Sequence, residues 1–337
     1  MKLLTKFMAL MLVVLAPMAV FAEGDFAGEA MSIGVGARPL GMGGTFAAIA
    51  NDASTSYWNP AGMANVQGVE VSSVKLTKIN DLDTKYSYVN LLYNVSPQVG
   101  AFGLGWLRQA IGGIQLSVVD NLGNPVKVDG LAENADNTVY IAYARSIASG
   151  FSVGTSIKIL MGNYPATATY SGSGPATATE VSYSGFGFDL GLHLKMGDLV
   201  KDLNGLSLGV NFQDVVTKQT WQVSGVSTKP TEETVPLNIK PGIAYDLKLG
   251  QFDVIAAFDL DTKFEQLIMH VGGELWWNNM VAVRGGIKNY SEITPGLTQA
   301  TDWSIGASIR WYFIGLDYAY VYNELTPVQY LSIIGKF

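Results

Sequence analysis

The chain has 337 residues and a formal net charge of −7, and 48% of its residues are hydrophobic while only 15% are charged, whereas soluble domains carry about 25% charged residues. It has no cysteine and two histidines, which excludes a disulfide framework, cysteine nucleophiles, thiolate metal sites and a histidine-rich metal site. An acidic chain without a basic cluster is a poor nucleic-acid binder, so we expect no nucleic-acid partner, and nothing in the sequence calls for a cofactor.

Residues 1–22 have the pattern of a signal peptide that is cleaved after Ala22. Lysines give the segment a positive start, the apolar core over 8–15 is too short to cross a bilayer, and small residues precede the cleavage position. A membrane anchor is the alternative, which Pro17 and the short apolar run disfavour. We therefore expect an exported protein.

The next segment, residues 23–67, is rich in glycine and predicts compact, irregular structure. Residues 38–41 predict a turn and residues 45–50 a short helical run. Asn59 followed by Pro60 predicts a second short helix or turn, because asparagine is a good N-cap and proline suits the first helical position. The glycines approach the spacing of a dinucleotide-binding loop, but no strand–helix–strand pattern surrounds them, which argues against a nucleotide site.

From residue 68 onward, apolar and polar residues alternate, as in strands with one apolar and one polar face. In residues 301–313, for example, Trp303, Ile305 and Ile309 share one face and Ser304 and Ser308 the other. About fourteen such segments are expected, near residues 69–79, 83–95, 98–108, 137–148, 151–161, 183–196, 205–214, 235–247, 251–260, 266–277, 279–290, 301–313, 314–323 and 327–337. Abundant apolar residues without long apolar runs predict an all-β fold, a transmembrane antiparallel β-barrel over 68–337, because closure leaves no unpaired edge.

Loop lengths and aromatic residues support the barrel. Connections after even-numbered strands are mostly tight, whereas several after odd-numbered strands are long (109–136, 162–182 and 215–234), as expected of periplasmic turns and extracellular loops in an outer-membrane barrel. Aromatic residues near strand ends predict girdles at the two membrane interfaces; they are Trp106, Tyr143, Trp277, Trp303, Trp311, Tyr318 and Tyr322. The final strand closes on Phe337 and resembles the C-terminal signal read by the barrel assembly machinery.

A barrel of this size is wide enough to need filling. Residues 23–67 are too apolar for a solvated periplasmic linker, the alternative placement, and we predict that they form a hatch inside the lumen. The domain organisation expected is therefore a signal peptide over 1–22, a hatch over 23–67 and a barrel over 68–337.

The hatch sequence "IGVGARPLGMGGTFAAIANDASTSYWNPAGMANV" resembles the N-terminal signature of the long-chain fatty-acid transporter (FadL/toluene-transporter) superfamily of outer-membrane barrels, and most of all its PorV/PorQ branch. The matching positions in this chain are Arg38, Gly41, Met42, Gly43, Gly44, Phe46, Ala48, Asp52, Ala53, Ser54, Tyr57, Trp58, Asn59, Pro60, Ala61 and Gly62. Residues 270–288, "HVGGELWWNNMVAVRGGIK", resemble a hairpin of the same branch.

The resemblance implies a fourteen-stranded barrel whose hatch, with its Asn59-Pro60-Ala61 element, gates the path of hydrophobic molecules. It also implies a kinked third strand that opens a lateral exit, where Gly100, Gly103 and Gly105 would permit the bend. Glycines that face a crowded lumen are the alternative explanation. PorV relatives instead bind proteins of the type IX secretion and surface-attachment machinery, so the resemblance leaves open a second role.

Several charged or titratable residues fall on the polar faces of the strands, and a lumenal polar cluster is one interpretation of them; they are Asp189, His193, His270, Glu274, Arg284, Arg310 and Asp317. Ordinary bonding between wall and hatch is the plainer alternative. No arrangement of a catalytic triad is apparent, so the sequence does not predict an enzyme. We expect an outer-membrane channel, in contact with the lipid bilayer, that takes up hydrophobic molecules such as long-chain fatty acids. A fatty-acid-like ligand, or a detergent in its place, would occupy the lumen.

Overall fold

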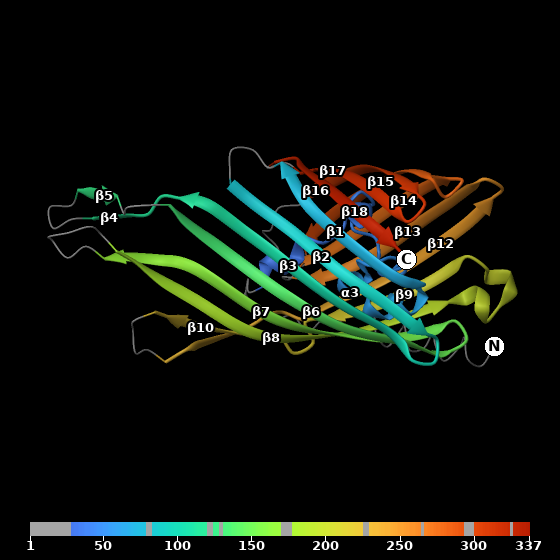
Figure 1. Cartoon of the computed structure of the whole chain (residues 1–337), viewed down its shortest axis with the longest axis horizontal. Coiled ribbons are helices and arrows are strands. Elements are labelled where there is room, and N and C mark those ends of the chain that lie inside the picture. The colour runs from blue at the N-terminus through green and yellow to red at the C-terminus, as the bar shows by residue number, and fades with distance from the viewer. Residues whose placement is uncertain are drawn as a thin grey trace.

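The computed structural model describes residues 28–78, 83–119, 124–127, 131–169, 177–224, 229–263, 266–292, 300–323 and 326–337. Within these ranges, 16 strands form one sheet, and all but two of them, β10 and β11, close into a ring because β8 pairs with β9 as well as with β7 (Figure 1). Every adjacent pair in the ring is antiparallel, including β1 with β18. The barrel of fourteen strands predicted from the alternation is thereby confirmed. The predicted signal peptide lies outside the described residues.

The ring follows the chain order, with each strand beside its predecessor. Its strands are β1 (Gly68–Lys78), β2 (Asp83–Ser96), β3 (Gly100–Ile114), β6 (Ala132–Ala148), β7 (Phe151–Thr169), β8 (Thr177–Lys195), β9 (Leu206–Gln213), β12 (Asn238–Leu249), β13 (Phe252–Lys263), β14 (Gln266–Trp277), β15 (Val281–Glu292), β16 (Ala300–Trp311), β17 (Ile314–Tyr322) and β18 (Val328–Lys336). We call the end of the barrel that holds Gly68 and Phe337 the turn end, and the opposite end the loop end.

The regions predicted as long loops contain strand, so these expectations are corrected. β7 and β8 extend to Thr169 and from Thr177, which places most of 162–182 in the wall. The other two regions contain short strands, namely β4 (Ser117–Val119), β5 (Pro125–Lys127), β10 (Lys218–Val223) and β11 (Thr231–Thr234). These four short strands have six residues or fewer, too few for a clear period-2 pattern, although their backbones pair.

The rule of loop lengths holds with two exceptions. The connection from β8 to β9 is a turn-end connection, yet it contains two 3₁₀ turns, η3 (Met196–Asp198) and η4 (Lys201–Leu203). The connection from β13 to β14 lies at the loop end and is short, because β13 ends at Lys263 and β14 begins at Gln266.

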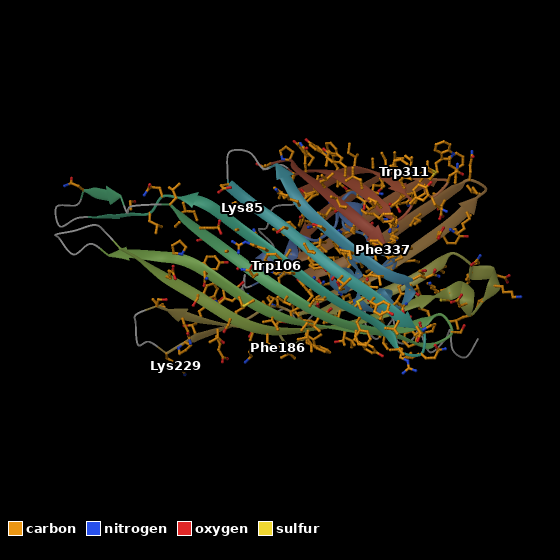
Figure 2. The ribbon with its side chains drawn as sticks, viewed as in Figure 1. Lys85, Trp106, Phe186, Lys229, Trp311 and Phe337 are labelled. Carbon is orange, nitrogen blue, oxygen red and sulfur yellow. The ribbon has the colours of Figure 1, made fainter. Side chains whose placement is uncertain are left out.

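The outer surface of the barrel is apolar, as the alternation predicts. On β16, Ile305 and Ile309 are 53% and 61% exposed, whereas Ser304 and Ser308, each of which directly precedes one of them, are 3% and 2% exposed. Figure 2 shows Trp106, Phe186 and Trp311 on the outside of the barrel. All seven residues of the predicted girdles are exposed there. This is the surface that a barrel in contact with lipid presents, and in the described ranges no helix is long and apolar enough to cross a membrane.

Residues 28–67 lie inside the ring and are almost entirely buried (Figure 1). They form η1 (Glu29–Ser32), α2 (Ala37–Leu40), α3 (Thr55–Trp58) and η2 (Pro60–Asn65). The side chain of Asn59 caps η2, accepting a hydrogen bond from the amide of Ala61 at 3.1 Å. Two local expectations are corrected: residues 37–40 form a one-turn helix, and residues 45–50 form a turn instead of a helical run. We call residues 28–67 the inner segment.

Candidate functional site: a lumen divided by the inner segment

Glycines on the inner wall let the inner segment lie directly against the strands. A Cβ atom at Gly209 would stand 2.0 Å from the carbonyl oxygen of Ala47, and one at Gly286 would stand 2.1 Å from the carbonyl carbon of Met42. Gly154, Gly191 and Gly272 are equally close to the inner segment. These glycines belong to five strands, β7, β8, β9, β14 and β15, so backbone meets backbone around much of the ring.

Glycines within the inner segment itself also lie close to the wall. Gly43 and Gly44 have φ angles of +70° and +84°, a conformation that glycine adopts without strain. A Cβ at Gly43 would lie 2.8 Å from the backbone of Ile287, and one at Gly41 would lie 3.0 Å from the Arg284 side chain. Gly62 packs against Ala50 within the inner segment, where a Cβ would approach the Ala50 carbonyl oxygen to 2.2 Å.

Asn59, the first residue of the Asn-Pro-Ala element, is fully buried, and both the oxygen and the nitrogen of its side-chain amide form hydrogen bonds. Besides capping η2, its Nδ2 atom donates to the carbonyl oxygen of Ala47 at 2.7 Å and to that of Leu192 on β8 at 3.0 Å. Pro60 and Ala61 lie against Gly154 and Gly191. The element therefore joins two parts of the inner segment to the wall.

Arg38 is the centre of a buried ion-pair network. Its guanidinium contacts Glu274 on β14 at 2.7 Å and Asp52 at 3.2 Å, and these three side chains are at most 8% exposed. Arg284 also binds Glu274, at 2.8 Å, and Asp317 binds Arg310 at 2.7 Å. Ser308 connects the two halves through hydrogen bonds to Arg284 and Asp317. Burial alone would lower the pKa of Arg38, but the carboxylates of Glu274 and Asp52 hold it above its usual value, so Arg38 stays charged.

The seven residues considered as a lumenal polar cluster occupy four separate places. Glu274, Arg284, Arg310 and Asp317 belong to the Arg38 network. Asp189 instead forms a buried triad with Lys158 and Asp214. His193 and His270 each bond to a backbone carbonyl of the inner segment, Ala48 at 2.8 Å and Gly43 at 2.6 Å.

The sequence did not single out five further buried charged residues that bond to these groups, to one another or to the inner segment; they are Lys158, Asp214, Lys240, Asp259 and Asp261. Each lies on a lumen-facing position of a strand, or next to one, and their alternation with apolar residues was the available signal. The alternation says which side of the wall a residue faces, but it does not say which charge on another strand it meets. The part of the chain that the structure describes contains no group of three or more His, Cys, Asp or Glu residues able to hold a metal ion.

The third barrel strand is not opened at its glycines. Gly103 pairs with Leu92 on β2 and Ala142 on β6, and Gly105 is likewise paired on both sides without a register shift. Both face a crowded lumen, where a Cβ at Gly103 would lie 3.1 Å from the sulfur of Met63. Gly100 has a φ of +102° and begins the strand. Close packing, the alternative weighed for these glycines, is what the geometry supports in place of a kink.

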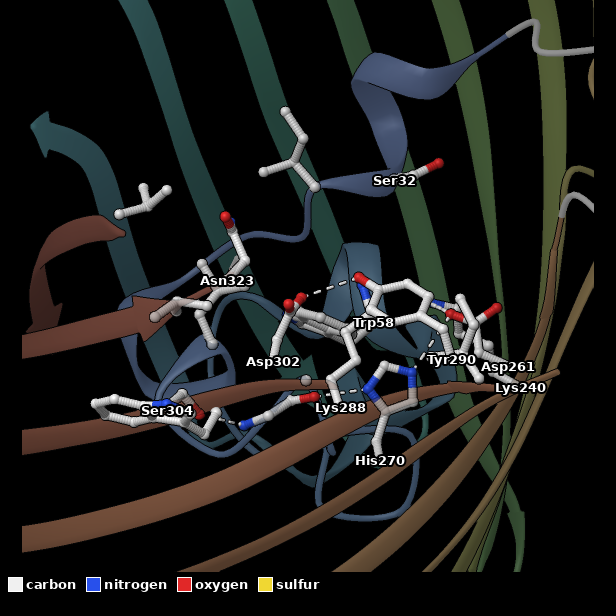
Figure 3. A pocket seen from close by; sticks show the side chains of 18 of the residues that line it. Ser32, Trp58, Lys240, Asp261, His270, Lys288, Tyr290, Asp302, Ser304 and Asn323 are labelled. Atoms are coloured by element: carbon white, nitrogen blue, oxygen red, sulfur yellow. Dashed lines mark hydrogen bonds and ion pairs between the residues drawn. The ribbon is translucent and has the colours of Figure 1, made fainter. Parts of the chain in front are cut away.

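An upper cavity of about 460 Å³ lies between the inner segment and the loop end (Figure 3). Its apolar and aromatic lining includes Ile33, Leu40, Trp58, Ile268, Val321, Val328 and Tyr330, and its charged or polar lining includes Lys240, Asp261, His270, Lys288 and Asp302. Lys240 pairs with Asp261 at 2.8 Å, and the Tyr290 hydroxyl donates to Asp302 at 3.1 Å. The ammonium group of Lys288 lies 4.7 Å from the centre of the Tyr290 ring.

A lower cavity of about 450 Å³ lies on the opposite side of the inner segment, towards the turn end. Its lining is polar for the most part and includes Asn51, Asn65, Gln67, Glu70, His193, Lys195, Ser207, Asp246 and Lys336, beside Ala48, Ile49 and Ala244. Glu70 and Lys336 form an ion pair at 3.1 Å.

Phe337 lies at the turn end, where the barrel closes. Its backbone exchanges two hydrogen bonds with Val69 at 2.8 and 3.0 Å, and its ring, which is 71% exposed, stands 5.5 Å from that of Phe313. The terminal residue therefore completes the β1–β18 seam while presenting its ring outward.

The fold and the filled lumen define a β-barrel of the type found in outer-membrane channels. Residues 19–245 match the Uncharacterised protein family (UPF0164), so the chain belongs to that family. No curated protein sequence matches it.

Solved structures share the fold at low sequence identity. The CymD monoaromatic hydrocarbon channel is 14% identical with a TM-score of 0.60, over 90% of this chain and 98% of that chain. The Ralstonia pickettii toluene transporter TbuX is 16% identical with a TM-score of 0.57, over 90% and 98%. The Pseudomonas putida toluene transporter TodX is 14% identical with a TM-score of 0.52, over 89% and 96%. At these identities the likeness is one of fold.

Proposed function

We propose that the protein is an outer-membrane channel that takes up small hydrophobic molecules carrying an anionic group, such as long-chain fatty acids. The observation that carries the proposal is the upper cavity, where Lys288 faces an apolar and aromatic space. An apolar body would fill that space, and its acidic group would reach the Lys288 ammonium.

The charges of the cavity support an anionic group in particular. Lys240 is matched by Asp261, and Asp302 accepts the Tyr290 hydroxyl. Among the described residues, by contrast, Lys288 has no carboxylate at ion-pair distance, and its ammonium lies over an aromatic ring. A charge-assisted bond to a carboxylate is about twice as strong as a neutral hydrogen bond, so a ligand with an acidic group would gain most here.

The surroundings of the cavity support a channel role. The apolar outer surface suits an outer membrane, and the names of the similar structures, hydrocarbon channels and toluene transporters, agree with apolar cargo. The inner segment below the cavity would act as the hatch, with the Asn59-Pro60-Ala61 element part of its attachment. The signal peptide and Phe337 would direct the chain to the outer membrane and its assembly machinery.

The test is native mass spectrometry of the protein extracted gently from outer membranes, followed by oleate binding to the purified barrel. We expect a bound acidic lipid, at least tenfold weaker oleate binding in Lys288→Met, and near-normal binding in Lys288→Arg, which keeps the charge. Lys85→Met removes an exposed lysine and serves as the matched control. Oleate binding that is equal in all four proteins would overturn the proposal. A stoichiometric protein partner over an empty cavity would favour the secretion and surface-attachment role instead.

A further inference from the structure

We propose that cargo leaves the barrel through the turn end, into the periplasm, by passing from the upper to the lower cavity when residues 45–50 move aside. This inference rests on the proposed channel function and adds the route. It replaces exit through a gap in the wall by exit along the barrel axis.

The wall offers no lateral opening among the described residues. All neighbouring strands of the ring are hydrogen-bonded, and the register shifts lie near strand ends, for example between Asn94 and Ser96 and between Ile111 and Ile114. The ladder between β12 and β13 ends at Gly242 and Asp259, and beyond it Thr262 holds the seam by hydrogen bonds with Asn238 and Ile239. Opening the middle of the ladder would leave backbone groups unpaired in lipid, where no water is present to bond them. A lateral route would therefore need bonds that the resting barrel has to break.

On the axial route, in contrast, one short stretch of the inner segment has residues in the lining of both cavities. Gly43 and Gly44 line the upper cavity, while Ala48 and Ile49 line the lower cavity. Only Thr45, Phe46 and Ala47 separate these residues in sequence. A displacement of this short stretch would join two spaces that are already about 460 and 450 Å³ in volume.

The stretch is attached to the wall by few side chains and carries backbone strain. The Asp259 carboxylate on β13 accepts the amides of Phe46 at 2.6 Å and Ala47 at 2.8 Å, and the carbonyl of Ala48 bonds to His193. Ala50 at the end of the stretch has a φ of +26°, which is unfavourable for a residue with a Cβ. Residues with positive φ thus stand at both ends of the stretch, Gly44 and Ala50, and Asp259 is its principal anchor.

The lining of the lower cavity narrows the class of cargo. The cavity is lined by side-chain amides and by charged residues, namely Glu70, Lys195, Asp246 and Lys336. These groups would form hydrogen bonds with a polar group of the cargo. A purely apolar molecule would instead displace their water and leave them without partners, which costs free energy. Among the acidic amphiphiles proposed as cargo, the route therefore suits those with a short apolar body, which are small enough to enter water, better than long-chain fatty acids. A cargo that must stay in lipid would gain nothing from it.

The absence of cysteine from the chain permits a direct test. In Ala244→Cys, on β12, the new thiol would line the lower cavity. Ala256 on β13 pairs with Tyr245, which follows Ala244 in the chain and faces the opposite side of the wall. In Ala256→Cys the thiol would therefore lie at about the same height on the outer face. Each variant is labelled in detergent with a bulky methanethiosulfonate, checked by mass and reconstituted into liposomes. The probe is radiolabelled 1-octanesulfonate, an amphiphile that stays charged and so does not cross bilayers by itself.

We expect the label at position 244 to slow uptake into the liposome interior at least tenfold, with recovery after reduction, and the label at position 256 to change it less than twofold. Undiminished uptake with the lower cavity labelled would overturn the axial route while leaving the channel function intact. Uptake no faster than in protein-free liposomes, with unlabelled protein, would instead refute the channel function itself.

A second variant tests the moving stretch without a label. Asp259→Ala removes the acceptor of two backbone amides and should speed octanesulfonate uptake several-fold. Glu133→Ala, which removes an exposed carboxylate on β6 that pairs with Lys85 and Arg108, is the control and should leave uptake unchanged. Equal rates for Asp259→Ala and the unaltered protein would argue against residues 45–50 as the barrier.

Discussion

Replacing Arg38 by methionine should loosen the inner segment while leaving the barrel intact. In the folded protein, Arg38, Arg284 and Arg310 face Glu274, Asp52 and Asp317, so the buried network is neutral. Arg38→Met keeps much of the volume but leaves one negative charge in excess, next to side chains that are nearly inaccessible to water. Breaking a buried pair by removing one partner costs about 3–5 kcal/mol.

The lower end of that range applies because Glu274 keeps two partners, Arg284 and the indole of Trp276. A cost of about 3 kcal/mol corresponds to a roughly 100-fold larger opening constant, at 1.4 kcal/mol for each factor of ten. The cost falls on the contact between the inner segment and the wall, so local opening, and not loss of the strand ladder, is the expected response.

Hydrogen exchange followed by mass spectrometry measures this opening in peptides that cover residues 37–62. Backbone amides of Gly41, Gly44 and Asn59 are hydrogen-bonded within the segment and report on it. We expect them to exchange roughly 100-fold faster in Arg38→Met, while β13 to β16 stay protected. Lys85→Met, which breaks an exposed pair with Glu133, should change exchange little.

The double variant Arg38→Met with Glu274→Gln provides a further check. It restores neutrality, so protection of residues 37–62 should recover for the most part, since removing both members of a buried pair is far less costly than removing one. Exchange in Arg38→Met within threefold of the unaltered protein would refute the reasoning. So would equal loosening in Arg38→Met and the double variant.

Three further outcomes are expected. The unboiled protein should migrate differently from the boiled protein on a denaturing gel, because the closed ladder resists detergent; identical mobility after gentle extraction would contradict a closed barrel. Gly209→Val should displace the inner segment, since even a Cβ would lie 2.0 Å from the Ala47 carbonyl oxygen, whereas Gly273→Val on β14, where a Cβ would meet no atom nearer than 3.7 Å, should not; protease digestion within residues 45–62 separates the two. Deleting Phe337 should lower outer-membrane levels and remove two hydrogen bonds to Val69, each worth about 1 kcal/mol; unchanged levels would place the assembly signal elsewhere.

Local polarity was enough to predict the wall. Whether a strand residue faces lipid or lumen depends on its own side chain and its neighbours two positions away, so the alternation in 301–313 predicts the exposed Ile305 and the buried Ser304 correctly. The same rule fails at the loop end. Beyond residue 162, the sequence of β7 no longer alternates between apolar and polar residues, and only pairing with β8 shows that it remains a strand.

The interior could not be predicted in the same way, because its contacts join residues that are distant in the chain. Arg38 and Glu274 are 236 positions apart, and alternation states only that Glu274 faces inward. Which carboxylate meets which arginine depends on strand order, tilt and the course of the inner segment. By itself, then, the sequence determined a barrel with a polar inner face and an apolar outer face; the tertiary structure alone decided how the buried charges pair, that the third strand stays closed, and that the lumen holds two cavities separated by a few residues.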